Sequence, residues 1–296
     1  MDAIAVTVRR GSLVEAVHRV HAVAVEDGRI TESAGDPGLV TFYRSSSKPL
    51  QALPLARERE DVTEVELAIA CASHRAEPPQ LEAARSLLER APATEADLEL
   101  GPQEGRGPSL LSHNCSGKHA GFLAVCQGRG WAIEGYRLAA HPLQQLLLDE
   151  IAAAADLDES EVATGVDGCG VPTFGMSLER MAYTFSRLAR LEGGGRIAAA
   201  MTAHPELIGY ERGATDTDLM RLRPGWIAKA GAEGLICAAT PEGLGIALKV
   251  EDGSMRAMRP ALAEFLRRLG LEPGELGVEP VVNSRGELVG EVVAER

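Results

Sequence analysis

Long hydrophobic runs and an excess of basic residues are both absent from this sequence. No apolar stretch approaches the roughly 20 residues that span a bilayer, so we expect no transmembrane segment. The N-terminus lacks a basic region followed by an apolar core, so we expect no signal peptide and a cytoplasmic protein. A net charge of -13 argues against a nucleic-acid backbone or an anionic membrane as partner.

Cysteines and aromatic residues are scarce. The 5 cysteines, an odd number, include no C-x-x-C pair. In a cytosolic chain this favours free thiols or metal ligands over a disulfide framework. Aromatic residues make up only 4% of the chain while Ala and Leu abound, so helices should form much of the core. With 296 residues, the chain can bury a large core as one domain or two lobes.

Strand patterns occupy both ends of the chain and helical patterns occupy the middle. Runs rich in Val and Ile, with Asp27-Gly28 as a hairpin turn, predict the N-terminal strands. The expected strands are 3–8, 14–25, 40–43, 225–230, 234–239, 243–250, 278–282 and 288–293. The expected helices are 79–90, 142–155, 177–191, 196–203 and 256–269, and 101–108 should be a loop.

This order predicts an α/β fold of the α+β type, built as a single domain over 1–296 with two lobes. N- and C-terminal strands would pair in one antiparallel sheet with flanking helices, forming a sheet lobe from 1–55 and 225–296. A mainly helical lobe, 56–224, would be inserted between them. We expect the functional cleft where the two lobes meet.

The stretch Ser45-Ser-Ser-Lys48 has the clearest chemical potential. Residues i and i+3 share a helix face, so the Lys48 amine can reach the Ser45 hydroxyl. A neutral amine can take the proton of a serine that attacks poorly by itself. The alternative is an ordinary helix cap followed by a solvated lysine.

Three further segments concentrate polar and small residues. In Cys71–Pro78, Ser73 is either part of a polar cluster or a helix cap. The segments Ser112–Gly121 and Gly165–Pro172 each place one cysteine among small or polar residues. Two separated thiolates can form half of a zinc site, completed by an imidazole or a neutral amine. The alternative is two buried thiols that act as small hydrophobic groups.

A lysine at position 229 begins a run of small residues on a predicted strand. Lys followed by small residues resembles the K-T-G element that lines the cleft of S-x-x-K hydrolases. The order also fits, because S-x-x-K precedes the helical lobe and this strand follows it. We therefore expect the Ser45–Lys48 stretch and the Lys229 strand to meet at one site.

Six motifs in order resemble the bacterial L-asparaginase II family, the rhizobial-type zinc-containing enzymes, nearly from end to end. They are Arg44–Gln51, Cys71–His74, His113–Gly121, Asp167–Pro172, His204–Glu206 and Lys229–Gly234. The resemblance implies a fold similar to serine β-lactamases and serine-dependent glutaminases, and a homodimer. It implies an L-asparaginase that hydrolyses the side-chain amide of L-asparagine through an acyl-enzyme.

The resemblance also implies roles for individual residues. The catalytic residues would be two Ser-Lys pairs, Ser45 with Lys48 and Ser73 with Lys229. One zinc ion per chain would be held by Cys115, Lys118 and Cys169. The substrate pocket would include Arg44, His113, Asn114 and, beside the metal, Asp167.

The chain departs from the family pattern at two positions. Relatives are expected to carry glycine at Ala76 and histidine at Gln80. The chain also lacks S-D-N and has Ala230 after its lysine, so β-lactam hydrolysis is a poor expectation. The alternatives are another amidohydrolase on the same scaffold, such as a glutaminase or D-amino-acid amidase, or a non-catalytic zinc-binding module.

Overall fold

The structure is a computed structural model that describes residues 2–210 and 213–295 and divides into two compact units. The sheet unit comprises Met1–Thr41, Met176–Ser186 and Ala230–Arg296. The helical unit comprises Phe42–Gly175 and Arg187–Lys229. These bounds differ from the expected lobe limits near residues 55 and 225, and the helical unit holds every predicted site residue.

The sheet unit contains one large sheet, with the strand order β10-β11-β1-β2-β9-β8-β7 and with β3 on β2. The strands are β1 (Ile4–Arg10), β2 (Leu13–Glu26), β3 (Arg29–Ala34), β7 (Ile227–Gly231), β8 (Leu235–Ala239), β9 (Gly245–Val250), β10 (Val278–Val282) and β11 (Leu288–Ala294). The predicted pairing of the two chain ends is confirmed, because β1 pairs antiparallel with β11 and β2 pairs antiparallel with β9.

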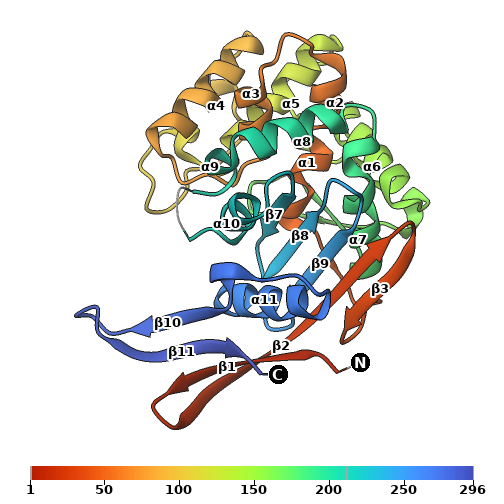
Figure 1. Cartoon of the computed structure of the whole chain (residues 1–296). Helices are drawn as coiled ribbons and strands as arrows, with labels where there is room; N and C mark the ends of the chain where they lie inside the picture. The colour runs from red at the N-terminus through yellow and green to blue at the C-terminus, as the bar shows by residue number, and fades with distance from the viewer. Residues whose placement is uncertain (1, 211–212, 296) are drawn as a thin grey trace. The chain divides into compact units, whose positions relative to one another are not determined.

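Two helices cover this sheet. Helix α11 (Met258–Arg268) lies across the strands in Figure 1 and buries Leu262 and Phe265 completely. Helix α7 (Leu178–Arg187) packs closely on β9, since a Cβ at Gly245 would lie 2.0 Å from the carbonyl oxygen of Ala182. The glycine therefore permits a helix–strand contact that no larger residue allows. The hairpin turn at Asp27-Gly28 is also confirmed, with φ of 48° and 74°.

The helical unit is built mainly from short helices, and a second, small sheet has the order β4-β6-β5. Its helices are α1 (Lys48–Gln51), α2 (Leu53–Glu58), α3 (Glu64–Ala70), α4 (Pro78–Arg90), α5 (Ser116–Gly128), α6 (Pro142–Ala155), α8 (Gly194–Ala203), α9 (Pro205–Ile208) and α10 (Thr215–Leu222). The small sheet consists of β4 (Val40–Phe42), β5 (Ala163–Val166) and β6 (Pro172–Ser177). The 3-10 turns are η1 (Arg44–Ser47), η2 (Glu95–Asp97), η3 (Leu110–Ser112), η4 (Glu159–Glu161), η5 (Leu188–Arg190), η6 (Met255–Ala257) and η7 (Gly274–Leu276), of which the last two belong to the sheet unit.

Helix α5 is the centre of the helical unit, and its residues 116–126 are all buried. It lies beside α3 and α4 (Figure 1). A Cβ at Gly117 would lie 2.2 Å from the carbonyl oxygen of Ile69, so only glycine allows α5 to approach α3 this closely. This contact brings the start of α5, with Cys115 and Lys118, next to the end of α3.

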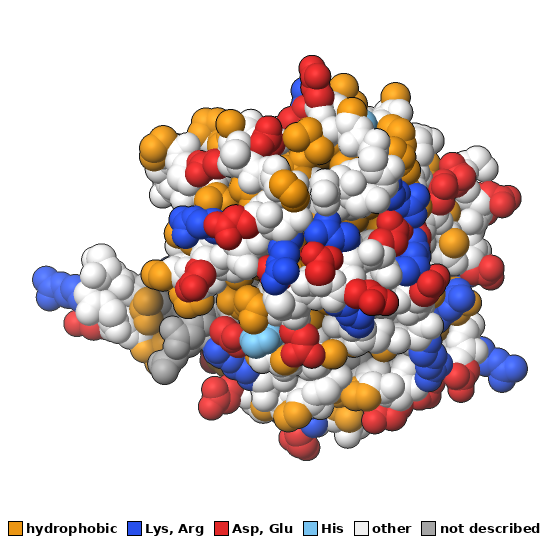
Figure 2. Space-filling model, turned by 90° about the horizontal axis from the view of Figure 1, so that it is seen from above, with side chains coloured by type: hydrophobic (Ala, Val, Ile, Leu, Met, Phe, Trp, Pro, Cys, Tyr) orange, Lys and Arg blue, Asp and Glu red, His pale blue; other side chains and the backbone are white. Residues whose placement is uncertain are grey.

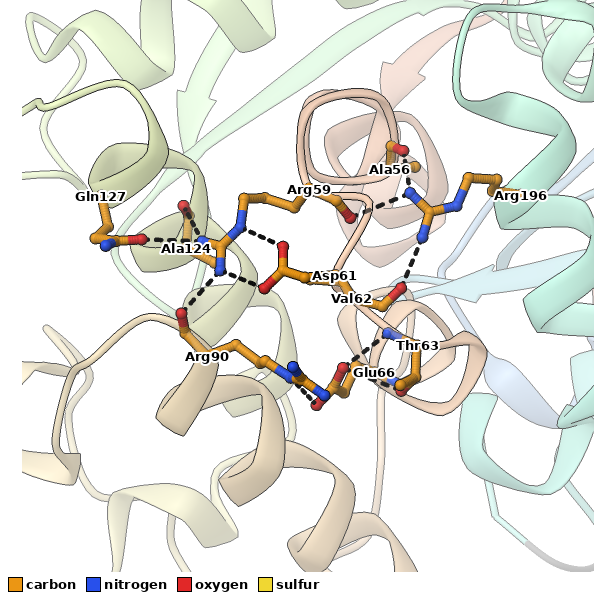
Figure 3. A network of polar contacts seen from close by, with 10 residues as sticks. All are labelled: Ala56, Arg59, Asp61, Val62, Thr63, Glu66, Arg90, Ala124, Gln127 and Arg196. Carbon is orange, nitrogen blue, oxygen red and sulfur yellow. Dashed lines mark hydrogen bonds and ion pairs between the residues drawn. The ribbon is translucent and has the colours of Figure 1, made fainter.

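Two arginines hold the segment between α2 and α3 (Figure 3). Arg196 donates to the carbonyl oxygen of Ala56 in the last turn of α2, where helix carbonyls lack intrahelical partners, and to those of Arg59 and Val62 in the segment that follows. Arg59 forms a two-pronged ion pair with Asp61 and also donates to backbone carbonyls of α4 and α5. The network fixes how α2 sits relative to α3, and the second predicted serine, Ser73, follows α3.

The surface shows how the acidic excess is distributed. On the face in Figure 2, acidic and basic side chains alternate and neither sign forms a continuous patch. None of the described helices is both long enough and apolar enough to cross a membrane.

Candidate active site

The Ser45–Lys48 segment forms a tight turn between β4 and α1. Arg44 has a φ of 50°, a left-handed conformation that non-glycine residues seldom adopt and that is often found at functional sites. Ser47 Oγ donates to the Arg44 carbonyl oxygen at 2.9 Å and closes the turn. Ser46 Oγ donates to the Lys229 carbonyl oxygen at 2.8 Å. The turn and the lysine strand, distant in sequence, are therefore adjacent.

The Lys48 side chain is buried, with only 1% of its surface exposed. Its Nζ donates to the carbonyl oxygen of Ala72 and, at 3.3 Å, to that of Asn114, and it lies 3.1 Å from Ser73 Oγ. The alternative of a cap followed by a solvated lysine is therefore excluded. The hydroxyl bonded to the Lys48 amine is that of Ser73, which the sequence had grouped with Lys229.

The surroundings of Lys48 favour its neutral form. Burial is the largest effect and lowers the pKa of the amine below its ordinary value, and the charges of Lys118 and Lys229 lower it further against the opposing Cys115. A neutral amine has two N–H groups and one lone pair. The carbonyls of Ala72 and Asn114 can only accept, so they take both N–H groups and leave the lone pair for the Ser73 hydroxyl.

The two predicted serines differ in their hydrogen bonding. Ser73 is anchored by its backbone N–H, which donates to the Ile208 carbonyl oxygen at 2.7 Å. Ser45 is half-buried, and within the described part of the chain its hydroxyl makes no hydrogen bond. The Ser45 hydroxyl is thus the less constrained of the two.

Lys229 is paired with an acidic residue that the sequence analysis missed. Its Nζ donates to Asp216 Oδ2 at 3.0 Å, and the two side chains are 1% and 3% exposed. Asp216 Oδ1 accepts from the Thr217 backbone N–H in the first turn of α10. The sequence signal for Asp216 is weak, because an acidic residue in a first helical turn usually serves only the helix dipole.

The predicted metal ligands form a compact cluster. Cys115, Lys118 and Cys169 are 4%, 4% and 6% exposed. Lys118 Nζ lies 3.1 Å from Cys169 Sγ. The hydrogen bond between the Cys115 and Cys169 sulfurs has opposite effects on the two thiols. It is the main cause that lowers the pKa of Cys115 well below its ordinary value, and the main cause that raises the pKa of Cys169. Burial lowers the pKa of the Lys118 amine, but the interactions with Cys169 and Cys115 raise it by more. The pKa of Lys118 is therefore raised.

These three side chains fit a zinc ion. Zinc is typically bound by thiolate sulfur and nitrogen in a closed shell, and here two sulfurs and one amine already meet at hydrogen-bond distance in a buried place. Counting only His, Cys, Asp and Glu, the described residues contain no group of three that could hold a metal. The third donor of this cluster is a lysine, which such a count leaves out.

The predicted pocket residues surround the cluster. Arg44 Nε donates to Asp167 Oδ1 at 2.8 Å. Burial works against the Asp167 carboxylate, but Lys118 and Arg44 overcome it and lower its pKa. His113 is buried, which lowers its pKa, and its Nδ1 accepts the Cys115 backbone N–H at 3.0 Å. Asn114 contributes its carbonyl oxygen to Lys48.

The two departures from the family pattern have clear structural places. Ala76 has a φ of 63°, where glycine would be unstrained. Gln80 is 1% exposed. Its Oε1 accepts the Arg75 and Glu77 backbone N–H groups, and its Nε2 donates to the Gly209 carbonyl oxygen at 3.0 Å. Gln80 therefore fixes the loop after Ser73 to the segment after α9.

A separate cavity of about 380 Å³ lies in the helical unit. Its lining includes Arg137, Leu138, Gln144, Val166, Gly170 and Phe174. None of the predicted catalytic or metal-binding side chains lines it, so its size does not make it the reaction site.

Taken together, the geometry suits acyl transfer by a hydroxyl and an amine. A buried amine of lowered pKa contacts a serine hydroxyl, a second serine precedes that lysine, and a second lysine is charge-paired nearby. Such an arrangement can generate a serine alkoxide, protonate a leaving amine and activate a water.

Comparison with known proteins identifies the family of this chain. The family model of L-asparaginase II matches residues 6–294. No relative was found among the curated proteins. A crystal structure of Mglu in its native form in 4.3 M NaCl is similar, with a TM-score of 0.51 and 14% identity over 87% of this chain. The present chain spans 62% of the length of that protein.

Two other solved structures are more distantly similar. One is the probable glutaminase ybaS, with a TM-score of 0.42, 18% identity and coverage of 86% of both chains. The other is the octameric penicillin-binding protein homologue from Pyrococcus abyssi, with a TM-score of 0.40, 10% identity and coverage of 86% of this chain and 74% of the other. The predicted fold class is confirmed: the chain has a mixed α/β fold with an antiparallel sheet and flanking helices, similar to that of Mglu.

Proposed function

This chain belongs to the L-asparaginase II family and is an amidohydrolase, and we propose that it hydrolyses the side-chain amide of L-asparagine to L-aspartate and ammonia. The observation that carries the proposal is the Lys48 amine. It is buried, its pKa is lowered, and its acceptor-only neighbours leave the lone pair to a serine hydroxyl. That is the arrangement a general base needs.

In the proposed first step, Ser45 attacks the amide carbon. Its hydroxyl is half-exposed and follows the strained Arg44, so it is available to a substrate. The proton of Ser45 passes to Ser73 while the proton of Ser73 passes to Lys48. Lys48 then returns a proton, through Ser73, to the departing nitrogen, which leaves as ammonia.

In the proposed second step, water hydrolyses the acyl-enzyme and L-aspartate is released. Lys48, again neutral, takes a proton of the water as the water oxygen bonds to the acyl carbon. It returns that proton through Ser73 to Ser45 Oγ as the acyl–oxygen bond breaks. Lys229, held by Asp216, supports this step as the second amine of the site and stabilises negative charge near Ser73. Arg44 and Asp167 are proposed to bind the polar groups of the substrate.

We also propose that Cys115, Lys118 and Cys169 hold one zinc ion, with Lys118 as the neutral amine. When bound, the metal supplies a Lewis-acid anchor that orients the substrate, rather than a hydroxide, because two thiolates reduce its effective charge. Asp167 lies in the same cluster through its interaction with Lys118. A homodimer is proposed as well, for which sedimentation should give twice the mass of one chain.

The function is tested by ammonia release from L-asparagine, L-glutamine and their D-forms. We expect L-asparagine to have the highest kcat/KM. Preference for glutamine or for a D-form would identify another amidohydrolase on this scaffold, and no release from any of them would favour a non-catalytic module.

The nucleophile is tested by rapid quenching with mass spectrometry of the acylated peptide. We expect the aspartyl adduct on Ser45, with none in Ser45→Ala, and a Ser73→Ala protein slowed at least 100-fold. An adduct on Ser73 would instead identify Ser73, whose hydroxyl contacts Lys48, as the nucleophile. If Ser45→Ala hydrolysed L-asparagine at the wild-type rate, Ser45 would have no catalytic role.

A further inference from the structure

His119 is a buried imidazole beside the thiol–amine cluster that no step above uses. It follows Lys118 on α5 and is 0% exposed. Its Nδ1 lies 2.6 Å from the Tyr136 hydroxyl. Its Nε2 is fully buried and has no hydrogen-bond partner among the described residues. A buried ring nitrogen without a partner is costly and calls for a reason.

The hydrogen bonds of Tyr136 assign the tautomer of His119. The Tyr136 oxygen accepts the backbone N–H of Glu99 at 3.0 Å, and that N–H can only donate. The hydroxyl proton therefore needs an acceptor, and His119 Nδ1 is the group at 2.6 Å. Nδ1 is thus the unprotonated nitrogen, and Nε2 carries the ring proton.

The side chains of His119 and Cys169 interact. Because Nδ1 is bonded to Tyr136, we assign the side of the ring that carries the Nε2–H to Cys169. Cys169 Sγ is also the atom that Lys118 contacts at 3.1 Å. The buried Nε2–H needs a hydrogen-bond acceptor, and a thiolate at Cys169 can be that acceptor. A thiolate that binds a metal keeps enough negative charge to accept a hydrogen bond.

We propose that His119 is a positioning residue for Cys169 as a metal-binding thiolate. The observed chain of donors runs from the Glu99 N–H to the Tyr136 hydroxyl and then to His119 Nδ1. The proposed last link is a hydrogen bond from Nε2–H to the metal-bound Cys169 thiolate. Because Nε2 holds a proton, its in-plane lone pair is not free and His119 does not bind the metal itself. This inference rests on the zinc site proposed above, and not on the identity of the substrate.

Three variants of the full-length protein test the role. His119→Gln keeps an N–H donor near the Nε2 position, His119→Leu removes it at similar volume, and Tyr136→Phe removes the group that sets the tautomer. Zinc affinity is measured by competition with a chromophoric chelator, and melting temperatures without metal serve as the folding control.

We expect His119→Leu to weaken zinc binding by about 10–100-fold, the usual effect of losing a partner of a metal ligand. His119→Gln should stay within about threefold of wild type, and Tyr136→Phe should lie between the two. With Co²⁺ in place of zinc, the thiolate-to-cobalt charge-transfer band should move to longer wavelength in His119→Leu and not in His119→Gln, because the hydrogen bond lowers the energy of the sulfur electrons. Equal affinity and an unchanged band in all three variants would overturn the proposal.

An experiment on the unaltered protein needs no variant to fold. Nitrogen-15 NMR of protein loaded with ¹¹³Cd should show His119 with the proton on Nε2 and without cadmium coupling. A proton on Nδ1, or coupling of Nε2 to cadmium, would make His119 a direct ligand and refute the positioning role. Failure of wild type to bind zinc or cadmium also defeats it, whereas loss of asparagine specificity in the ammonia assay would leave it intact.

Discussion

Replacing Asp216 by Asn tests the buried ion pair with Lys229. The two side chains are 1% and 3% exposed, with 3.0 Å between Nζ and Oδ2. At an effective dielectric constant near 20, opposite charges at this distance attract by about 5–6 kcal/mol. Asn keeps the size and the acceptor for Thr217, but it removes the negative charge that lies 3.0 Å from the buried Lys229 ammonium. We therefore expect the free energy of unfolding to fall by about 3–5 kcal/mol.

The assay is urea unfolding followed by circular dichroism for wild type, Asp216→Asn, Lys229→Met and the double variant. If the pair acts as a unit, the double variant should be more stable than the sum of the single effects by about 2 kcal/mol or more. Asp218→Asn is the control, because it removes a half-buried carboxylate from the same helix and should cost about 1 kcal/mol or less. Additive single effects, or a loss below about 1 kcal/mol for Asp216→Asn, would refute the reasoning.

Four further outcomes are expected. Because burial lowers the Lys48 pKa, kcat/KM should rise with pH through a midpoint below 10.5, the ordinary pKa of lysine. If a Lys48→Arg protein showed the same rise of kcat/KM with pH, Lys48 would not be the base. Ala76→Gly should raise the free energy of unfolding by about 0.5–1 kcal/mol, since it relieves a φ of 63°; a loss in thermal melts would contradict this. Arg196→Met should lower stability by about 2–4 kcal/mol in urea, because three partly buried carbonyls lose their donor, and a neutral effect would mean that water replaces it. Chelation of a zinc-loaded protein should lower its melting temperature in wild type and not in Cys169→Ser, and equal shifts would place the metal elsewhere.

Much of the sheet could be predicted from the sequence, because its signals are local. Val- and Ile-rich runs placed β1, β2 and β9, and the left-handed turn at Asp27-Gly28 marked the hairpin. Helix α6 matches its predicted bounds of 142–155, since Pro142 begins it and its apolar residues repeat with helical spacing. The expected helix 177–191 was less accurate, because its last residues form the 3-10 turn η5.

The site was predicted as a set of residues and not as a set of contacts. The motifs named Lys48, Ser73 and Lys229, and the structure brings their segments together in one unit. The sequence could not tell that Lys48 contacts Ser73, because a spacing of i and i+3 favours Ser45 equally well. Asp216 was missed because its partner comes from another element, and a carboxylate at a helix start has an ordinary explanation.

The sequence by itself determined the local elements, the family and the residue types of the site. Each of these depends on periodicity or on short spacings that are encoded within a few residues. Tertiary structure alone decided that the Lys48 amine is buried between the carbonyls of Ala72 and Asn114, and that the lone pair of its neutral form meets a hydroxyl. Burial, charge pairing and tautomer depend on neighbours brought in from distant parts of the chain, and those neighbours set the chemistry that each named residue can perform.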